Sequence, residues 1–502
     1  MRYHKLSSSI FIENRKKFTS HLKPNALAIF TSNDMYPTSA DAHLPFKQHS
    51  DILYLSGADQ EESILVLFPD AHKESLREVL FLKETNDLIA VWEGAKYSKD
   101  EAFEMSGIKT VFWLSDFERV FNEMAINAER IYINGNEHLR AHVETEMRHD
   151  RMNKWLKENY PGHEYERSQP ILHRIRGTKS EHELEVMRIA ADVTTKGYKR
   201  VLKFLKPGVW EYELEAEFMH EFLTNRSRGF AYTPIIAAGN NANVLHYIEN
   251  NDQCKSGDLI LFDVGAEYGN YTCDVTRCFP INGKFTDRQK EVYNAVLRVH
   301  EGAIAMLRPG TMLDAFHKEV GALMTKELLG LGLITAEDVA NEDPAWPAYK
   351  KYFMHGTSHY LGLDVHDYGL WTIPVEEGMV FTVEPGIYIP AEGLGIRLED
   401  DVVVQASGAP FNLIANIPIE ADEILRGILE KPRTPEKLKP VAAIATTGFC
   451  SPQNEIKVTT PPLGARYFFK KYSYFSVWKK QLLLEHHLAT PPKKRCCWVR
   501  AN

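Results

Sequence analysis

Two aspartates lie close together in a segment whose pattern predicts a β-hairpin. Asp263 falls in the apolar run 258–266, and Asp274 falls in the run 271–279. Residues 267–270 suit the turn, and a symmetric loop would bring the two aspartates opposite each other, with Cβ atoms ~5 Å apart. Like charges so placed are destabilising unless a cation or a shared proton neutralises them. The pair therefore predicts a cation site, with a salt-bridged or solvent-facing pair as the alternative.

Two glutamates follow the same pattern later in the chain. Glu384 ends an apolar run, and Glu399 lies in another run, two residues after Arg397. This spacing places Arg397 and Glu399 on one face of a strand, so we expect the arginine to orient or balance a carboxylate. Asp400 and Asp401 are expected to be ordinary strand-edge or salt-bridge groups.

Three histidines, His355, His359 and His366, fall within twelve residues between these carboxylates. Histidine among carboxylates in apolar runs is typical of a metal-ligand set, while Gly356 argues against a helix carrying His355 and His359. Five ligands rich in carboxylate suit two divalent ions, with Mn, Co or Fe no less than Zn. Two such ions can share a hydroxide and clamp the carbonyl that it attacks, so hydrolysis is the leading reaction class.

Other catalytic signatures are absent from the sequence. It contains no HExxH, GxSxG or GxxxxGK[ST] motif and no GxGxxG after a predicted strand. Zincins, serine hydrolases, P-loop enzymes and Rossmann oxidoreductases are therefore disfavoured.

The composition is typical of a globular protein with a large core, because 44% of the 502 residues are apolar and 25% are charged. A net charge of −9 argues against a nucleic-acid partner. The sequence has no apolar stretch of the ~18 residues that a membrane span needs. Six cysteines without a CxxC pair indicate a reducing compartment, so we expect a cytoplasmic protein.

The elements that position the candidate residues repeat along the chain. Ser180 and Glu183 form a capping box that opens a helix with an apolar stripe, and the Lys-Pro-Gly at 206–208 ends it. A similar stripe follows 102 positions later, and the Arg-Pro-Gly at 308–310 repeats the stop. Two related halves of helices and strands usually enclose one site between them.

We expect three regions in the chain. Residues 1–173 alternate β-rich runs with polar helical stretches, which predicts an α/β accessory domain, and a catalytic domain follows at 174–430. Strands are expected at 26–30, 64–68, 79–82 and 131–133. Residues 431–502 contain fourteen Lys or Arg and three acids, so their charge is +11 and the remaining chain carries −20. This basic, proline-containing tail predicts a disordered extension, with a basic arm for an anionic partner as the alternative.

The order Asp263, Asp274, His359, Glu384, Glu399 resembles the metal ligands of the pita-bread metallopeptidases, specifically the Xaa-Pro aminopeptidases (aminopeptidase P). The motifs HGTSHYLGLDVHD, VEPGIYIP and GIRLEDD and the N-terminal stretch at 45–57 carry the resemblance, which extends from about residue 15 to about residue 425. It implies an α+β pita-bread catalytic domain with pseudo-two-fold halves, preceded by a smaller α/β N-terminal domain.

The resemblance also implies a dinuclear metallo-aminopeptidase, most often Mn²⁺-activated, with Co, Fe or Zn as alternatives. It would hydrolyse the N-terminal Xaa-Pro bond of peptides through a hydroxide bridging two divalent ions. Asp263 would bind one ion, Asp274 and Glu399 would bridge both, and His359 and Glu384 would complete the second. Glu384 would be the general base, and His246 and His366 would flank the attacked carbonyl.

Four further residues match positions around such a site. His355, Tyr388 and Arg397 correspond to supporting or proline-pocket residues, with packing or a structural ion pair as the alternative. Trp92 resembles a tryptophan that reaches a neighbouring subunit's site, although it could equally belong to the core. The resemblance thus implies a homo-oligomer, a dimer or a tetramer.

Three other functions compete with an Xaa-Pro aminopeptidase. A prolidase, which cleaves only Xaa-Pro dipeptides, uses the same metal set and is the nearest alternative. A methionine aminopeptidase lacks a comparable accessory domain, and a non-catalytic pita-bread peptide-binding protein would have lost its ligands. The expected partners are therefore peptides with proline at the second position, without nucleic acid or membrane.

Overall fold

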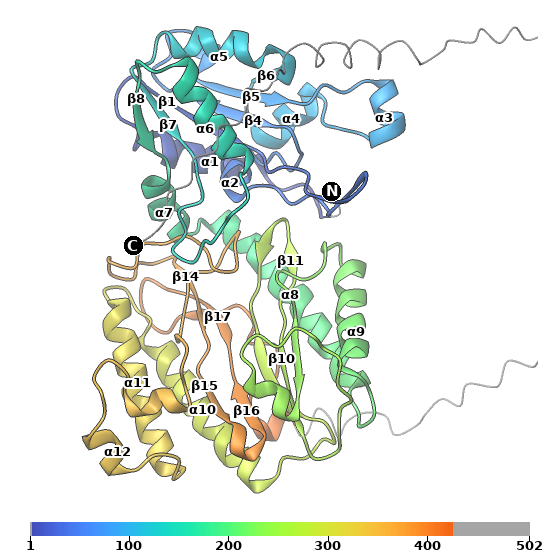
Figure 1. Cartoon of the computed structure of the whole chain (residues 1–502), viewed down its shortest axis with the longest axis vertical. Coiled ribbons are helices and arrows are strands. Elements are labelled where there is room, and N and C mark those ends of the chain that lie inside the picture. Colours follow the sequence, from blue (N-terminus) through green and yellow to red (C-terminus); the bar gives the residue numbers. More distant parts are fainter. Residues whose placement is uncertain (1–2, 425–502) are drawn as a thin grey trace, which may run out of the picture. The chain divides into compact units, whose positions relative to one another are not determined.

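A computed structural model describes residues 3–424 of the chain (Figure 1). The predicted tail at 431–502 lies outside the described residues. Within 3–424, no helix is both long enough and apolar enough to cross a membrane.

Six short strands in the N-terminal region form one mixed sheet in the order β6-β5-β4-β1-β7-β8. β4 is antiparallel to both of its neighbours, and the other neighbouring strands are parallel. The strands are β1 (Ala26–Thr31), β4 (Ile64–Leu67), β5 (Glu78–Leu82), β6 (Thr110–Trp113), β7 (Arg130–Ile133) and β8 (Glu164–Arg167). The four predicted strands are confirmed, and the two that the sequence reasoning missed, β6 and β8, are the edge strands.

Helices cover both faces of this sheet because successive strand residues point to opposite sides. Ala28 and Phe30 of β1 pack in one apolar cluster, whereas Leu27 and Ile29 pack in another. The helices and the small hairpin of this region are α1 (Ser8–Thr19), α2 (Ser50–Ser56), α3 (Asp87–Glu93), α4 (Lys99–Ser106), α5 (Phe117–Ala125), α6 (Arg148–Asn159), β2 (Pro37–Ser39) and β3 (Ala42–His43). The N-terminal region is therefore a layered α/β unit, as predicted.

The remaining chain repeats one arrangement of two helices and a small sheet, which confirms the predicted duplication. The repeat contains two pairs of helices, and the predicted Pro-Gly stop separates the two helices of each pair. The predicted capping box at Ser180 begins the first helix of the first pair. The helices are α8 (Glu181–Phe204), α9 (Glu211–Thr224), α10 (Asp287–Met306), α11 (Leu313–Gly330) and, outside the repeat, α7 (Gln169–Gly177) and α12 (Ala336–Ala340). The boundary predicted at 173/174 falls inside α7 and stays a prediction.

Each half contributes a three-stranded sheet, in the orders β13-β10-β9 and β14-β17-β18, and Figure 1 shows β10 and β17 in the middle of this region. The strands are β9 (Ile235–Ala238), β10 (Leu259–Asp263), β13 (Thr276–Pro280), β14 (Val380–Val383), β17 (Asp400–Val403) and β18 (Phe411–Asn412). Two further hairpins are β11 (Glu267–Tyr268) with β12 (Tyr271–Thr272) and β15 (Gly386–Ile389) with β16 (Leu394–Arg397). Helices paired with segregated antiparallel sheets give the predicted α+β class.

The predicted register of the aspartate hairpin is wrong by two residues. Asp263 pairs with Thr276 instead of Asp274, because the turn consists of two residues, Gly269 and Asn270, both with positive φ. Such a turn suits the twist of a hairpin. Asp274 lies in the break between β12 and β13, and Glu399 likewise lies in a break between β16 and β17. Both carboxylates therefore sit where a strand is interrupted.

A cluster of charges around the buried Arg176 joins the N-terminal region to the loop that carries His366. Arg176, 1% exposed, donates hydrogen bonds to Asp51 of α2 and Asp364, both at 2.8 Å, and to Asp367. Lys179 donates a further bond to Asp367 at 3.1 Å. Buried charges need such partners, and removal of one partner is far more costly than loss of a surface pair. The cluster thus fixes the loop around residues 364–367.

We predict that Arg176→Met lowers the free energy of unfolding by roughly 3–5 kcal/mol, because it leaves the buried Asp51 without its cation. Urea unfolding followed by circular dichroism measures the change. Arg174→Met is the matched control, because Arg174 pairs with Glu376 at 3.0 Å with both side chains 42% exposed, and it should cost less than ~1 kcal/mol. Equal losses in the two variants would contradict this account of the cluster.

Candidate functional site

The five predicted ligands converge on one cleft of about 500 Å³. The first half of the duplicated region contributes the two aspartates, at the end of β10 and in the break before β13. The second half contributes the two glutamates, after β14 and in the break before β17. The lining side chains include Asp263, Asp274, His359, Glu384 and Glu399. The cleft therefore lies between the halves, as the duplication predicts.

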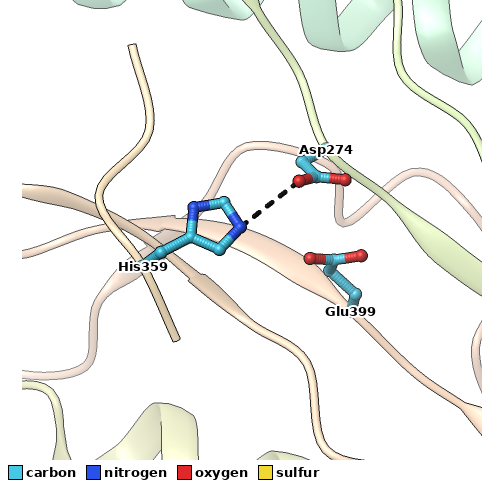
Figure 2. A group of neighbouring side chains, drawn as sticks. All are labelled: Asp274, His359 and Glu399. Atoms are coloured by element: carbon cyan, nitrogen blue, oxygen red, sulfur yellow. Dashed lines mark ion pairs between the residues drawn. The ribbon is translucent and has the colours of Figure 1, made fainter. Parts of the chain in front are cut away.

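Three of these side chains are close enough to hold one metal ion. Ligand atoms of Asp274, His359 and Glu399 all lie within 4.8 Å of one another, and Figure 2 shows the side chains pointing toward one another. The Nδ1 atom of His359 is 2.9 Å from the carbonyl oxygen of Tyr360. Since a carbonyl only accepts, Nδ1 carries the proton and Nε2 keeps a free lone pair. Nε2 faces Asp274 Oδ2 at 3.5 Å and Glu384 Oε1 at 3.7 Å.

The crowding of these carboxylates changes their pKa values. Burial and then repulsion from the neighbouring carboxylates raise the pKa of Glu399 well above its ordinary value. Burial likewise raises the pKa of Asp263, and it raises that of Glu384 to about 7. For Asp274, burial is outweighed by the attraction of His359 in its protonated form together with the hydroxyl of Tyr232 and the ring of His366, so the pKa is lowered. A divalent cation would stabilise the ionised forms of all four, so the donor set fits a metal centre.

A hydrogen-bonded chain supports the wall of the cleft. Arg397 donates to Asp263 Oδ2 at 2.6 Å and to the Tyr388 hydroxyl at 2.9 Å. The hydroxyl lies 2.8 Å from Nε2 of His355, whose Nδ1 is 2.8 Å from the carbonyl of Gly356. Nδ1 must then be the donor, and Tyr388 donates to Nε2. The three predicted supporting residues therefore form one chain that ends on Asp263.

The two histidines expected beside the reacting carbonyl, His246 and His366, also line the cleft. The ring of His366 contacts that of His359, with centroids 4.4 Å apart. His246 is exposed, and the buried carboxylate of Glu211 holds its loop by accepting from Tyr247 Oη and from the backbone N–H of Asp252, both at 2.8 Å. Sequence reasoning missed Glu211, which only the fold brings to this loop.

Two further residues at the site were missed. Tyr232 donates to Asp263 Oδ1 at 2.6 Å, and no pattern around it in the sequence indicates this contact. Asp401 was expected at a strand edge or in a salt bridge, but it is buried and its Oδ2 accepts the backbone N–H of Asp274 at 3.0 Å. Asp400, in contrast, forms the expected ion pair, with Arg277 at 2.5 Å. Asp401 thus fixes the backbone that presents Asp274.

Trp92 lies away from the residues that line the cleft. It is on α3 with 82% of its side chain exposed, and its neighbours Leu88 and Val91 are also largely exposed. The alternative that Trp92 belongs to the core is therefore wrong.

Comparison with known proteins gives consistent matches. The model of metallopeptidase family M24 matches residues 185–406, and that of the aminopeptidase P N-terminal domain matches residues 11–132. The Xaa-Pro aminopeptidase of Escherichia coli is 33% identical over 84% of this chain and 97% of its own length. Human Xaa-Pro aminopeptidase 3 is 32% identical over 84% of each chain.

A solved structure agrees with these matches. The aminopeptidase P of Pseudomonas aeruginosa superposes with a TM-score of 0.77 at 32% identity, covering 85% of this chain and 98% of that chain. The predicted pita-bread fold with its N-terminal α/β domain is thereby confirmed. The chain therefore belongs to the Xaa-Pro aminopeptidases of metallopeptidase family M24 and is a metallo-exopeptidase, a hydrolase of peptide bonds, and Asp274, His359 and Glu399 in its cleft are a candidate metal-binding group.

Proposed function

We propose that this protein removes the N-terminal residue of peptides whose second residue is proline. Two divalent ions in the cleft, with Mn²⁺ as the expected metal, would take part in the reaction. The observation that carries the proposal is the convergence of one histidine, three buried carboxylates and the partly buried Glu384 from both halves of the fold. Asp263, Asp274, His359, Glu384 and Glu399 would hold the ions. When bound, such ions lower the pKa of water and polarise a carbonyl oxygen.

Glu384 is the proposed general base. Its side chain is 20% exposed, against 12% for Asp263 and 8% for Asp274, so it is the more accessible of these carboxylates. Its oxygens lie 3.7 Å from both His355 Nδ1 and His359 Nε2, which restrict where the carboxylate can point. A partly accessible carboxylate that lines the cleft can take a proton from the attacking water and return it to the leaving nitrogen.

His246 and His366 are proposed to stabilise the oxyanion that forms on the attacked carbonyl, because each lines the cleft and can donate an N–H. The bond to proline is a tertiary amide without an N–H, so recognition must come from the shape of the pocket and from contacts to the ring. The chain Arg397–Tyr388–His355 supports that wall.

The first test compares three peptides with Mn²⁺-loaded protein: Xaa-Pro-Yaa, the dipeptide Xaa-Pro, and Xaa-Ala-Yaa. We expect the first to be cleaved with a kcat/KM at least ~10²-fold above the other two, because the pocket is shaped for the proline of a longer peptide. Release of the N-terminal amino acid, measured by amine detection, reports the rate.

Each of the other outcomes has a distinct meaning. Faster cleavage of the dipeptide would assign the protein as a prolidase, and equal cleavage of the alanine peptide would refute proline specificity. Absence of any cleavage would refute the proposed activity.

The second test removes one candidate ligand without changing its shape. Glu399→Gln should reduce the bound metal per chain, measured by mass spectrometry of the purified protein, and should lower turnover at least ~10²-fold, because an amide replaces a buried anionic donor. Glu376→Gln is the control, since Glu376 pairs with Arg174 on the surface. Unchanged metal content in Glu399→Gln would refute the ligand assignment without any measurement of activity.

We further propose a homo-oligomer, a dimer or a tetramer, with α3 in the interface. Leu88 is 71%, Val91 is 78% and Trp92 is 82% exposed, and three large apolar side chains on one short helix are typical of an interaction surface. Trp92 would then reach the site of a neighbouring subunit. Cytoplasmic location stays a prediction from the cysteine pattern.

A further inference from the structure

A second cavity, with a volume of about 650 Å³, adjoins the catalytic cleft. Residues of the N-terminal region line one side of it, among them Lys47, His49 and Arg140. Asp364 and His366 of the catalytic region line the other. Arg140 and His366 also line the cleft that holds the carboxylates, so these two side chains stand where the two cavities meet.

Arg140 has unused hydrogen-bonding capacity at this junction. One terminal nitrogen of its guanidinium, Nη1, lies 2.8 Å from Nε2 of His366. A guanidinium has five N–H donors and no acceptor, so Nε2 accepts here and most of the donors stay available. Within residues 3–424, no carboxylate lies within ion-pair distance of Arg140, whose guanidinium contacts His366. A ligand that offers a carboxylate would supply one.

The charges around the second cavity also favour an anion. Three cations, Lys47, Arg140 and Arg176, and two carboxylates, Asp150 and Asp364, line it, together with His49, His138, His149 and His366. Arg176 is already paired with Asp364. Asp150 accepts the backbone N–H of Met147 at 2.9 Å and lies 3.5 Å from His149. Lys47 interacts electrostatically with Asp364 and Glu267. Arg140 therefore remains as the cation of this cavity without a partner carboxylate among the described residues.

A peptide substrate has opposite charges at its two ends, which decides its direction in the site. Its N-terminal ammonium is attracted by the carboxylate cluster of the cleft and repelled by Arg140. The segment after the scissile bond carries carbonyl oxygens, the C-terminal carboxylate and any acidic side chains. This segment is the part of the substrate whose charge complements the junction.

We infer that Arg140 forms a specificity subsite for a carboxylate on the residue that follows proline, either the C-terminal carboxylate of a tripeptide or an acidic side chain. The inference rests on the proposed function and names a substrate class within it. The N-terminal region would then take part directly in substrate selection, through a side chain that binds the leaving segment while contacting His366.

The experiment compares pairs of peptides that differ only in charge. The first pair is Xaa-Pro-Ala as the free acid and as its amide, and the second is Xaa-Pro-Asp-amide and Xaa-Pro-Asn-amide. The Mn²⁺-loaded protein should prefer the charged member of at least one pair ~10-fold in kcat/KM, because a charge-assisted bond to a guanidinium is among the strong ones. The two pairs distinguish the terminal from the side-chain carboxylate.

Two variants attribute the preference to Arg140. Arg140→Met should reduce the ratio within the preferred pair to about one, and Arg140→Glu should invert it so that the neutral peptide is cleaved faster. Arg174→Met, at an exposed ion pair elsewhere, should leave the ratio as in the unchanged protein. A ratio within one protein sample does not depend on the fraction of active molecules, so partial misfolding cannot imitate the result.

Two results would overturn the inference while leaving the proposed function intact. One is a ratio of about one in the unchanged protein. The other is an equal loss on both members of each pair in Arg140→Met, which would make Arg140 a positioning residue for His366. Failure of the unchanged protein to cleave any Xaa-Pro peptide would instead refute the proposed function.

Discussion

Three buried carboxylates and the partly buried Glu384 repel one another in one cleft, and the surrounding structure is organised to hold them together nonetheless. Burial alone already disfavours their ionised forms, and each added like charge increases the cost. Within the described chain, Arg397 is the arginine that reaches this group, through Asp263. One guanidinium cannot balance four carboxylates, so the cleft needs further positive charge. Divalent metal use by this family supplies a physical reason for the arrangement.

Hydrogen bonds from surrounding residues fix the orientation of these carboxylates. Asp263 accepts from Tyr232 and Arg397, which use both of its oxygens. Glu399 accepts from Thr276 at 2.6 Å, and the backbone of Asp274 donates to Asp401. Such outer contacts fix side chains that would otherwise move apart. Because the ligands lie at strand ends and breaks, their backbone is held by the sheets while their side chains are free to face the cleft.

The N-terminal region contributes to the site by electrostatics as well as by packing. Arg176 ties the loop of Asp364 and Asp367 to Asp51 in α2, and the same loop carries His366. Arg140 then approaches that histidine directly. The wall of the cleft therefore depends on Arg176 and Arg140, which lie 188 to 226 positions away in sequence from the residues of this loop that they contact. The N-terminal domain, which contributes none of the five predicted ligands, thus contacts a residue that lines the cleft.

The sequence by itself predicted the five candidate ligands that the fold brings to one cleft. It also indicated how the helices and central strands repeat, because spacing and apolar periodicity are local properties. It also determined the family, through motifs that lie within short segments. The register of Asp263 was predicted wrongly although a local signal was present, because Gly269-Asn270 suits a two-residue turn with positive φ and a four-residue loop was expected instead. Only the tertiary structure decided the partners Tyr232, Asp401 and Arg140. Contacts between distant segments depend on how the chain packs, and no local pattern encodes them.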